Sequence, residues 1–151
     1  MKKFISLFAA LFLYCNALVA QSGSIGTTGL RWDFDGSTRT LTISSTAGIV
    51  NMPDFNDSSI RPDWEAVITV SDIESVIIED GVASIGNCTF YDHGNLNSIE
   101  ISSSVTSIRR WAFYGCTSLT NINIPNSVKS IEDGIFQDCT SLTHINIPNS
   151  I

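Results

Sequence analysis

Basic residues are scarce in this chain of 151 residues, which carries 8 Lys and Arg against 15 Asp and Glu. Proteins bind nucleic acid chiefly through Lys and Arg side chains that neutralise phosphates. The composition therefore argues against a nucleic-acid partner, and equally against docking on anionic lipid. A surface excess of acid is typical of a protein that must stay soluble after export.

Histidine is scarcer still, because His93 and His144 are the only two and lie 51 residues apart. Neither has a Cys or an acidic residue at the spacing that zinc ligands need. The sequence also lacks a Gly-rich phosphate loop, and no Ser or Cys nucleophile with a nearby His is recognised. We expect no metal site, no cofactor and no catalytic residues, so the chain is predicted not to be an enzyme.

Long apolar runs are absent beyond the first residues. A basic start, Met1-Lys2-Lys3, precedes apolar residues 4–14 and a small residue at Ala20, the pattern of a secretory signal peptide. The run is shorter than the roughly 20 residues that span a bilayer. Removing residues 1–20 leaves 6 basic and 15 acidic residues, a formal charge of −9. This predicts an exported protein, secreted or at the cell surface, without membrane insertion after cleavage.

Three cysteines remain after the predicted leader. Cys116 and Cys139 are 23 residues apart, and equivalent positions on neighbouring parallel strands lie about 4.8 Å apart. This distance does not exclude a disulfide between them. Side chains in such a ladder point the same way, however, which does not suit the torsion of a disulfide, so two buried thiols are favoured. The slot of Cys88 holds Trp111 and Gly134 in the later rows, so Cys88 is expected nearer the surface.

The feature that is abundant is a 23-residue repeat. The stretch FYGCTSLTNINIPNSVKSI from Phe113 recurs as FQDCTSLTHINIPNSI from Phe136. A fixed period of this length predicts a solenoid, with three rows and the start of a fourth over residues 73–151. The apolar positions of the first full row recur in the others, and they are Ile73, Val76, Ile78, Val82, Ile85 and Phe90.

Each row is expected to contain a strand, a turn, a second extended piece and a short helix. Ile108, Ala112 and Cys116 fall four residues apart, the spacing of one helical face. Stacked rows should place each Phe on the Phe of the row before. His93 fills the slot of the later cysteines and is expected in the core.

Residues 21–72 are predicted to form an N-terminal cap. Residues 30–34 and 40–44 alternate apolar and polar around Asp35-Gly36-Ser37, as in a β-hairpin, while residues 21–28 read as a flexible lead. Phe55 and Trp64 should pack on the end of the core, and residues 65–70 should form a short helix or strand.

The pattern L-x-x-I-x-I-P-x-S-V-x-x-I-x-x-x-A-F-x-x-C at residues 119–139, with Ile135 for the alanine, resembles the BspA-type leucine-rich-repeat proteins of bacteria. The resemblance implies an α/β leucine-rich-repeat solenoid, horseshoe-like and β-rich with short helical turns. It also implies an adhesin-like role for a surface or secreted protein, and it carries no catalytic residues to this chain. The chain is shorter than such proteins usually are and is expected to have no C-terminal cap.

Two surfaces are candidates for binding an extracellular protein or glycan. One is formed by outward residues of the row strands, as repeat proteins often use such a ladder; the other is a basic–aromatic pair of a type enriched in hot spots. The alternative, that these residues only keep the surface solvated, stays open. The candidates are Ser98, Glu100, Asn121, Asn123, His144 and Asn146 on the strands, and Arg110 and Trp111.

The repeat ends with Leu142, Ile145, Ile147 and Ile151, whose row lacks its Phe and Cys. Unpaired apolar edges of this kind favour association. This end is therefore expected to be frayed, to self-associate or to continue in a longer protein. The alternative to a binding module is accordingly a truncated or N-terminal fragment with a structural role only.

Overall fold

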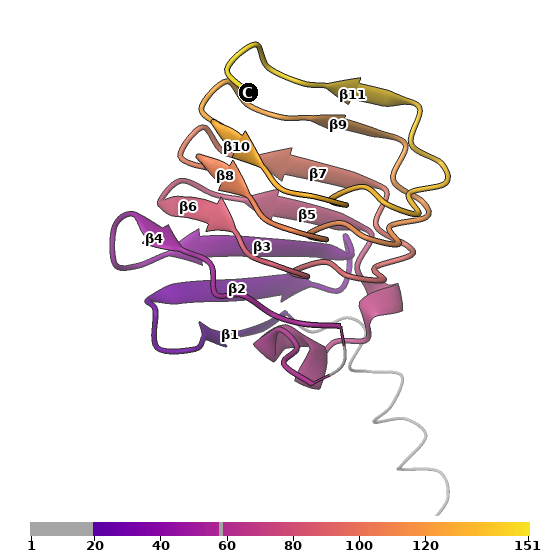
Figure 1. Ribbon diagram of the computed structural model, residues 1–151. Coiled ribbons are helices and arrows are strands. Elements are labelled where there is room, and N and C mark those ends of the chain that lie inside the picture. The colour runs from indigo at the N-terminus through magenta and orange to yellow at the C-terminus, as the bar shows by residue number, and fades with distance from the viewer. Residues whose placement is uncertain (1–19, 58) are drawn as a thin grey trace, which may run out of the picture.

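The computed structural model describes residues 20–57 and 59–151, so the predicted signal peptide lies almost wholly outside the described residues. The chain winds through successive rows that stack on one another, from the indigo N-terminal strands to the yellow C-terminal row (Figure 1). The fold is β-rich and almost free of helix. Within the described ranges the helices are the 3-10 turns η2 (Asp63–Ala66) and η3 (Val70–Asp72), and neither has the length and hydropathy to cross a membrane.

The alternating apolar residues of each row form one strand of a parallel ladder. β5 (Ser75–Ile78) pairs with β7 (Ser98–Ile101), and β9 (Asn121–Asn123) pairs with β11 (His144–Asn146). In both pairs each residue lies opposite the residue 23 positions further on. Side chains alternate across a strand. The second and fourth residues of β5 and β7 therefore point into the core, and the first and third residues point outward.

The predicted second extended piece forms a second parallel sheet. Its strands are β6 (Val82–Ile85), β8 (Ser107–Ile108) and β10 (Ser130–Ile131), with β4 (Val50–Asn51) at the edge beside β6. Between the two sheets, one serine per row donates its hydroxyl to a carbonyl of the preceding row. These bonds join Ser104 to Val82, Ser127 to Val105 and Ser150 to Val128, at 2.8, 2.6 and 2.7 Å.

The third side of each row is not helical, so the prediction of a short helix was wrong. It is a chain of turns in which Trp111 and Gly115 have positive φ angles of 56° and 69°, which a right-handed helix excludes. The turns pair from row to row instead: the N–H of Phe90 donates to the carbonyl of Ala112 at 2.8 Å, and that of Phe113 to the carbonyl of Ile135 at 3.0 Å. Residues four apart therefore face the core together without forming a helix.

The predicted phenylalanine ladder is confirmed. Phe90 and Phe113 stack with centroids 5.5 Å apart and planes 9° apart, and Phe113 stacks on Phe136 at 5.8 Å and 14°. Trp64 continues the ladder below Phe90 at 6.0 Å, and Phe55 meets Trp64 edge-on. Burial of one such ring contributes about 1.5–3 kcal/mol, so the ladder is a main source of cohesion between rows.

The predicted hairpin forms from β2 (Leu30–Asp35) and β3 (Thr40–Ser45), and β3 pairs in parallel with β5. The expectation of a flexible lead was wrong, because β1 (Gln21–Ile25) pairs antiparallel with β2. The buried side chain of Ile25 opposite Leu30 holds this strand in place. Gly23 is needed for it, since a Cβ there would lie 2.7 Å from the Trp32 ring nitrogen.

All three described cysteines are free thiols, and no disulfide links Cys116 to Cys139. Their thiols donate instead to the carbonyls of Phe90 and Phe113 at 3.3 and 3.1 Å. The surface placement expected for Cys88 was wrong, because Cys88 is buried. The segment around Asp54 covers this slot: the Asn87 N–H donates to the Asp54 carboxylate at 3.0 Å.

Candidate binding surface

Six of the eight candidate residues lie together on the outward face of the row strands. His144 stands opposite Asn121 and Asn146 opposite Asn123 on β11 and β9. Ser98 and Glu100 occupy the equivalent positions of β7, and the side chains of all six are exposed. Side chains of neighbouring strands are linked by hydrogen bonds. The side-chain amide of Asn146 donates to the side-chain oxygen Oδ1 of Asn123 at 2.7 Å, and the Ser98 hydroxyl donates to the Ser75 hydroxyl at 3.0 Å.

The structure extends this face onto the hairpin, which the sequence reasoning missed. Thr40 and Thr42 of β3 lie opposite Ser75 and Ile77 of β5, and so continue the two outward columns. A hollow of about 340 Å³ lies beside them, with Asp33 in its wall. The signal was present in the sequence, because Thr40–Ile43 alternates with the same period as Ser75–Ile78.

The other two candidates, Arg110 and Trp111, lie on the turn side of their row, so the eight residues form two surfaces. Trp111 is 37% exposed, and the Arg110 guanidinium carbon lies 5.7 Å from the centre of its ring. The ring packs over the next row, since a Cβ at Gly134 would meet Trp111 Cδ1 at 2.5 Å. Arg110 also reaches Asp133 at 3.4 Å. Part of the Trp111 ring is therefore covered by packing against the next row.

Four of the six basic side chains that the structure describes are engaged by acids. Arg39 pairs with Asp72 and Glu74, Arg61 with Glu65, Arg109 with Asp54, and Arg110 with Asp133. Apart from the partly buried Arg61–Glu65 pair, these pairs are exposed and contribute little to stability, but together they leave few of the described cations free to meet phosphate. The prediction that this surface does not attract nucleic acid rests on the same shortage.

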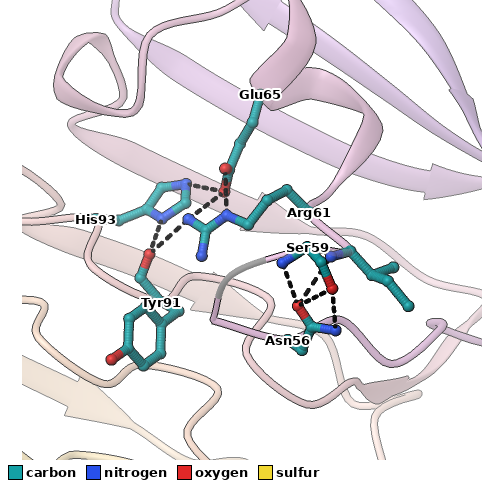
Figure 2. A network of polar contacts seen from close by, with 7 residues as sticks. Asn56, Ser59, Arg61, Glu65, Tyr91 and His93 are labelled. Atoms are coloured by element: carbon teal, nitrogen blue, oxygen red, sulfur yellow. Dashed lines mark hydrogen bonds and ion pairs between the residues drawn. The ribbon is translucent and has the colours of Figure 1, made fainter.

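A partly buried polar cluster joins the N-terminal segment to the first row. The guanidinium of Arg61 donates twice to the Glu65 carboxylate, at 2.6 and 2.9 Å, and once to the Tyr91 carbonyl at 3.1 Å. Figure 2 shows the Arg61 and His93 side chains converging on that carboxylate. Burial raises the pKa of Glu65 above its ordinary value and lowers the pKa of His93 to about 4.

The prediction that His93 is a packed core residue is confirmed, since its side chain is fully buried. The expected exposure of His144 is also confirmed. Across residues 20–57 and 59–151, no three His, Cys, Asp or Glu side chains gather in a way that could hold a metal ion. Burial raises the pKa of the Cys116 thiol, which keeps it protonated and unreactive.

Comparison with known families identifies the repeat. The model of the BspA type leucine rich repeat region matches residues 68–151 in six copies. No match was found among curated proteins.

Solved structures share the fold. A leucine-rich repeat protein from Eubacterium ventriosum is 22% identical, with a TM-score of 0.58 over 87% of this chain and 45% of that one. One from Bacteroides ovatus is 30% identical, with a TM-score of 0.52 over 66% and 25% of the two chains. One from Bacteroides capillosus is 19% identical, with a TM-score of 0.51 over 82% and 98%. This chain thus spans less than half the length of the first two.

Proposed function

Because the chain belongs to the family of BspA-type leucine-rich-repeat proteins, we propose that it is an exported, adhesin-like binding module. It recognises an extracellular protein or glycan through the outward polar face of its row strands. The observation that carries this is the alignment of the outward residues: polar side chains recur at two fixed positions on β7, β9 and β11, and all six candidates are exposed. The rows form a solenoid, with the hairpin as its N-terminal cap.

The polar ladder supports binding more than catalysis. Asn123 and Asn146 each offer a donor and an acceptor, and the bond between them uses only one of each. The remaining groups face solvent and can meet a ligand. A direct hydrogen bond contributes about 0.5–1.5 kcal/mol, so several rungs together give useful affinity.

The test is binding of the purified protein to immobilised extracellular matrix proteins and glycans. We expect Asn123→Ala with Asn146→Ala to weaken capture about tenfold, which corresponds to about 1.4 kcal/mol. A matched control is Asn126→Ala with Asn149→Ala, because these exposed amides are also 23 residues apart but lie in the turns after the strands. Equal losses in both double variants would refute the strand face as the binding surface.

Trp111 tests the second surface in the same assay. If Trp111→Ala weakens capture and the strand-face variant does not, the ligand binds on the turn side of the rows. Export is tested separately, by recovering from the culture medium or cell surface a mature chain that begins at Gln21.

A structural role is the second candidate, in which the chain is the N-terminal part of a longer repeat protein. Exposed apolar side chains of the last row favour it: Ile145, Ile147 and Ile151 are 43%, 57% and 51% exposed. A further row, or a second copy of the chain, would bury them. We expect an added row to raise the unfolding temperature, while sedimentation that becomes faster with concentration would indicate self-association.

A further inference from the structure

Residues 52–57 and 59–68, the covering segment, lie over the end of the phenylalanine ladder. Its Trp64 ring is fully buried on Phe90, and the Phe55 N–H donates to the Asn87 carbonyl at 2.9 Å. Removing this segment would uncover the first row. Its attachment therefore decides whether that end of the core is open or closed.

The polar cluster at this attachment contains a histidine with one unsatisfied nitrogen. His93 Nδ1 lies 3.2 Å from the Tyr91 carbonyl oxygen, which can only accept a hydrogen bond, so Nδ1 carries the proton. In the neutral ring Nε2 is then an acceptor. It has no hydrogen-bond partner among the described residues and faces the Glu65 Oε1 acceptor at 3.9 Å.

The charge at the attachment is balanced only while this site lacks a further proton. Arg61 and Glu65 from the covering segment compensate each other, and His93 is neutral. A proton on Nε2 would create an imidazolium on a fully buried side chain, which is costly. A proton on Glu65 would instead remove the counter-charge of Arg61. Either location leaves one uncompensated positive charge between the segment and the row.

From the row side, among the described residues, His93 meets neutral groups. They are the backbone carbonyls of Tyr91 and Phe90, the edge-on Phe90 ring at 5.6 Å and the Cys116 thiol one row further on. The thiol stays protonated because burial raises its pKa. Arg61 and Glu65 are therefore the charged side chains that the structure places against His93, whereas the Asp54 carboxylate of the same segment pairs with Arg109 at 2.7 Å.

We propose that Arg61, Glu65 and His93 form an acid-sensitive latch, which on proton uptake releases residues 59–68 from the first row and exposes Phe90 and Trp64.

Protonation of His93 weakens the attachment of the segment, protonation of Glu65 strengthens it, and the effect of His93 is the larger. In the attached state the pKa of His93 is about 4 rather than 6.5, so its contribution to attachment is present above 6.5 and is lost as the pH falls towards 4. The raised pKa of Glu65 acts the other way, because the attached state takes up that proton more readily than the released one. The pKa shift of His93 alone can change the equilibrium between the attached and the released segment by at most about 300-fold. The opposite pKa shift of Glu65 makes that change smaller.

Hydrogen exchange of the full chain tests the latch, with protection corrected for the intrinsic rate at each pH. Between about pH 7 and pH 4.5 we expect protection of residues 59–68 to fall about tenfold or more, while β5 and β7 stay protected in the same sample. Each histidine can be replaced by the residue that a neighbouring row carries, which gives matched variants. His93→Cys should abolish the loss of protection, and His144→Asn should leave it unchanged.

Loss of protection in His93→Cys equal to that of the natural chain would overturn the proposal, as would constant protection in the natural chain. If His93→Cys does not fold, the imidazole resonances of the natural chain decide. A His93 ring whose titration coincides with the loss of protection in residues 59–68 supports the latch, and one that titrates without that loss, or at its ordinary value, refutes it.

Discussion

Replacing Gly134 by Ala tests how Trp111 is held, without touching the indole itself. Gly134 has a φ of +67°, and a Cβ built there would lie 2.5 Å from Trp111 Cδ1 and 2.6 Å from Nε1. Atoms cannot approach so closely, so the ring must leave its place on the next row. Gly134→Ala is therefore expected to destabilise the protein by strain and by displacement of the ring.

The magnitude follows from both effects. An L-residue in the left-handed region costs about 1–2 kcal/mol, a strain that Cys88 and Trp111 already carry at the same slot with φ of 52° and 56°. Moving the ring into solvent exposes on the order of 100 Å² of apolar surface, or about 2.5 kcal/mol at 25 cal/mol per Å². Together these predict a loss of about 3–5 kcal/mol.

A double-mutant cycle separates the two effects. In a Trp111→Ala background the ring is gone, so Gly134→Ala should cost only the backbone strain of about 1–2 kcal/mol. Urea unfolding followed by circular dichroism gives the four free energies without relying on Trp fluorescence. If Gly134→Ala costs the same in both backgrounds, Trp111 does not pack on Gly134 and the reasoning is refuted.

Three further predictions concern single sites. Phe113→Ala should cost about 3–5 kcal/mol because its buried ring has a stacking partner on each side, whereas Phe136→Ala should cost clearly less because its ring is partly exposed; equal losses in thermal unfolding would contradict this. Cys139, the only partly exposed thiol of the three, should be alkylated before the two others by mass spectrometry, and the opposite order would count against the structure. The hydrogen bond to Asp138, and then its charge, raise the pKa of Tyr114 to about 12, so Asp138→Asn should lower that pKa in an ultraviolet titration; an unchanged curve would exclude the contact.

The strands and the ladder could be predicted because they depend on periodicity alone. An alternation of period two places Val76 and Ile78 inward in any parallel stack, and a fixed repeat forces Phe90, Phe113 and Phe136 into one column. His93 was correctly placed in the core for the same reason, since cysteines fill its slot in the later rows. These features need no knowledge of distant contacts.

The errors arose where periodicity is ambiguous or where distant segments meet. Four-residue spacing fits a helix and equally a chain of turns, and the choice depends on positive φ at Trp111, which its residue type does not reveal. Cys88 is buried only because the segment around Asp54, 34 residues earlier, covers it. The Arg61–Glu65–His93 cluster was missed because its members come from two regions that the repeat does not relate.

The row-to-row hydrogen bonds on all three sides have a mechanical consequence. Strands, turns and serine hydroxyls all bond one row to the next, so the bonds lie along the stacking direction while the chain runs across it. When the two ends of the chain are pulled apart, the force acts on the hydrogen bonds of the outermost row first, so the rows separate one after another. Each row that peels away releases 23 residues, about 80 Å of extended chain. The molecule should therefore yield at low force in regular steps, as an extensible tether.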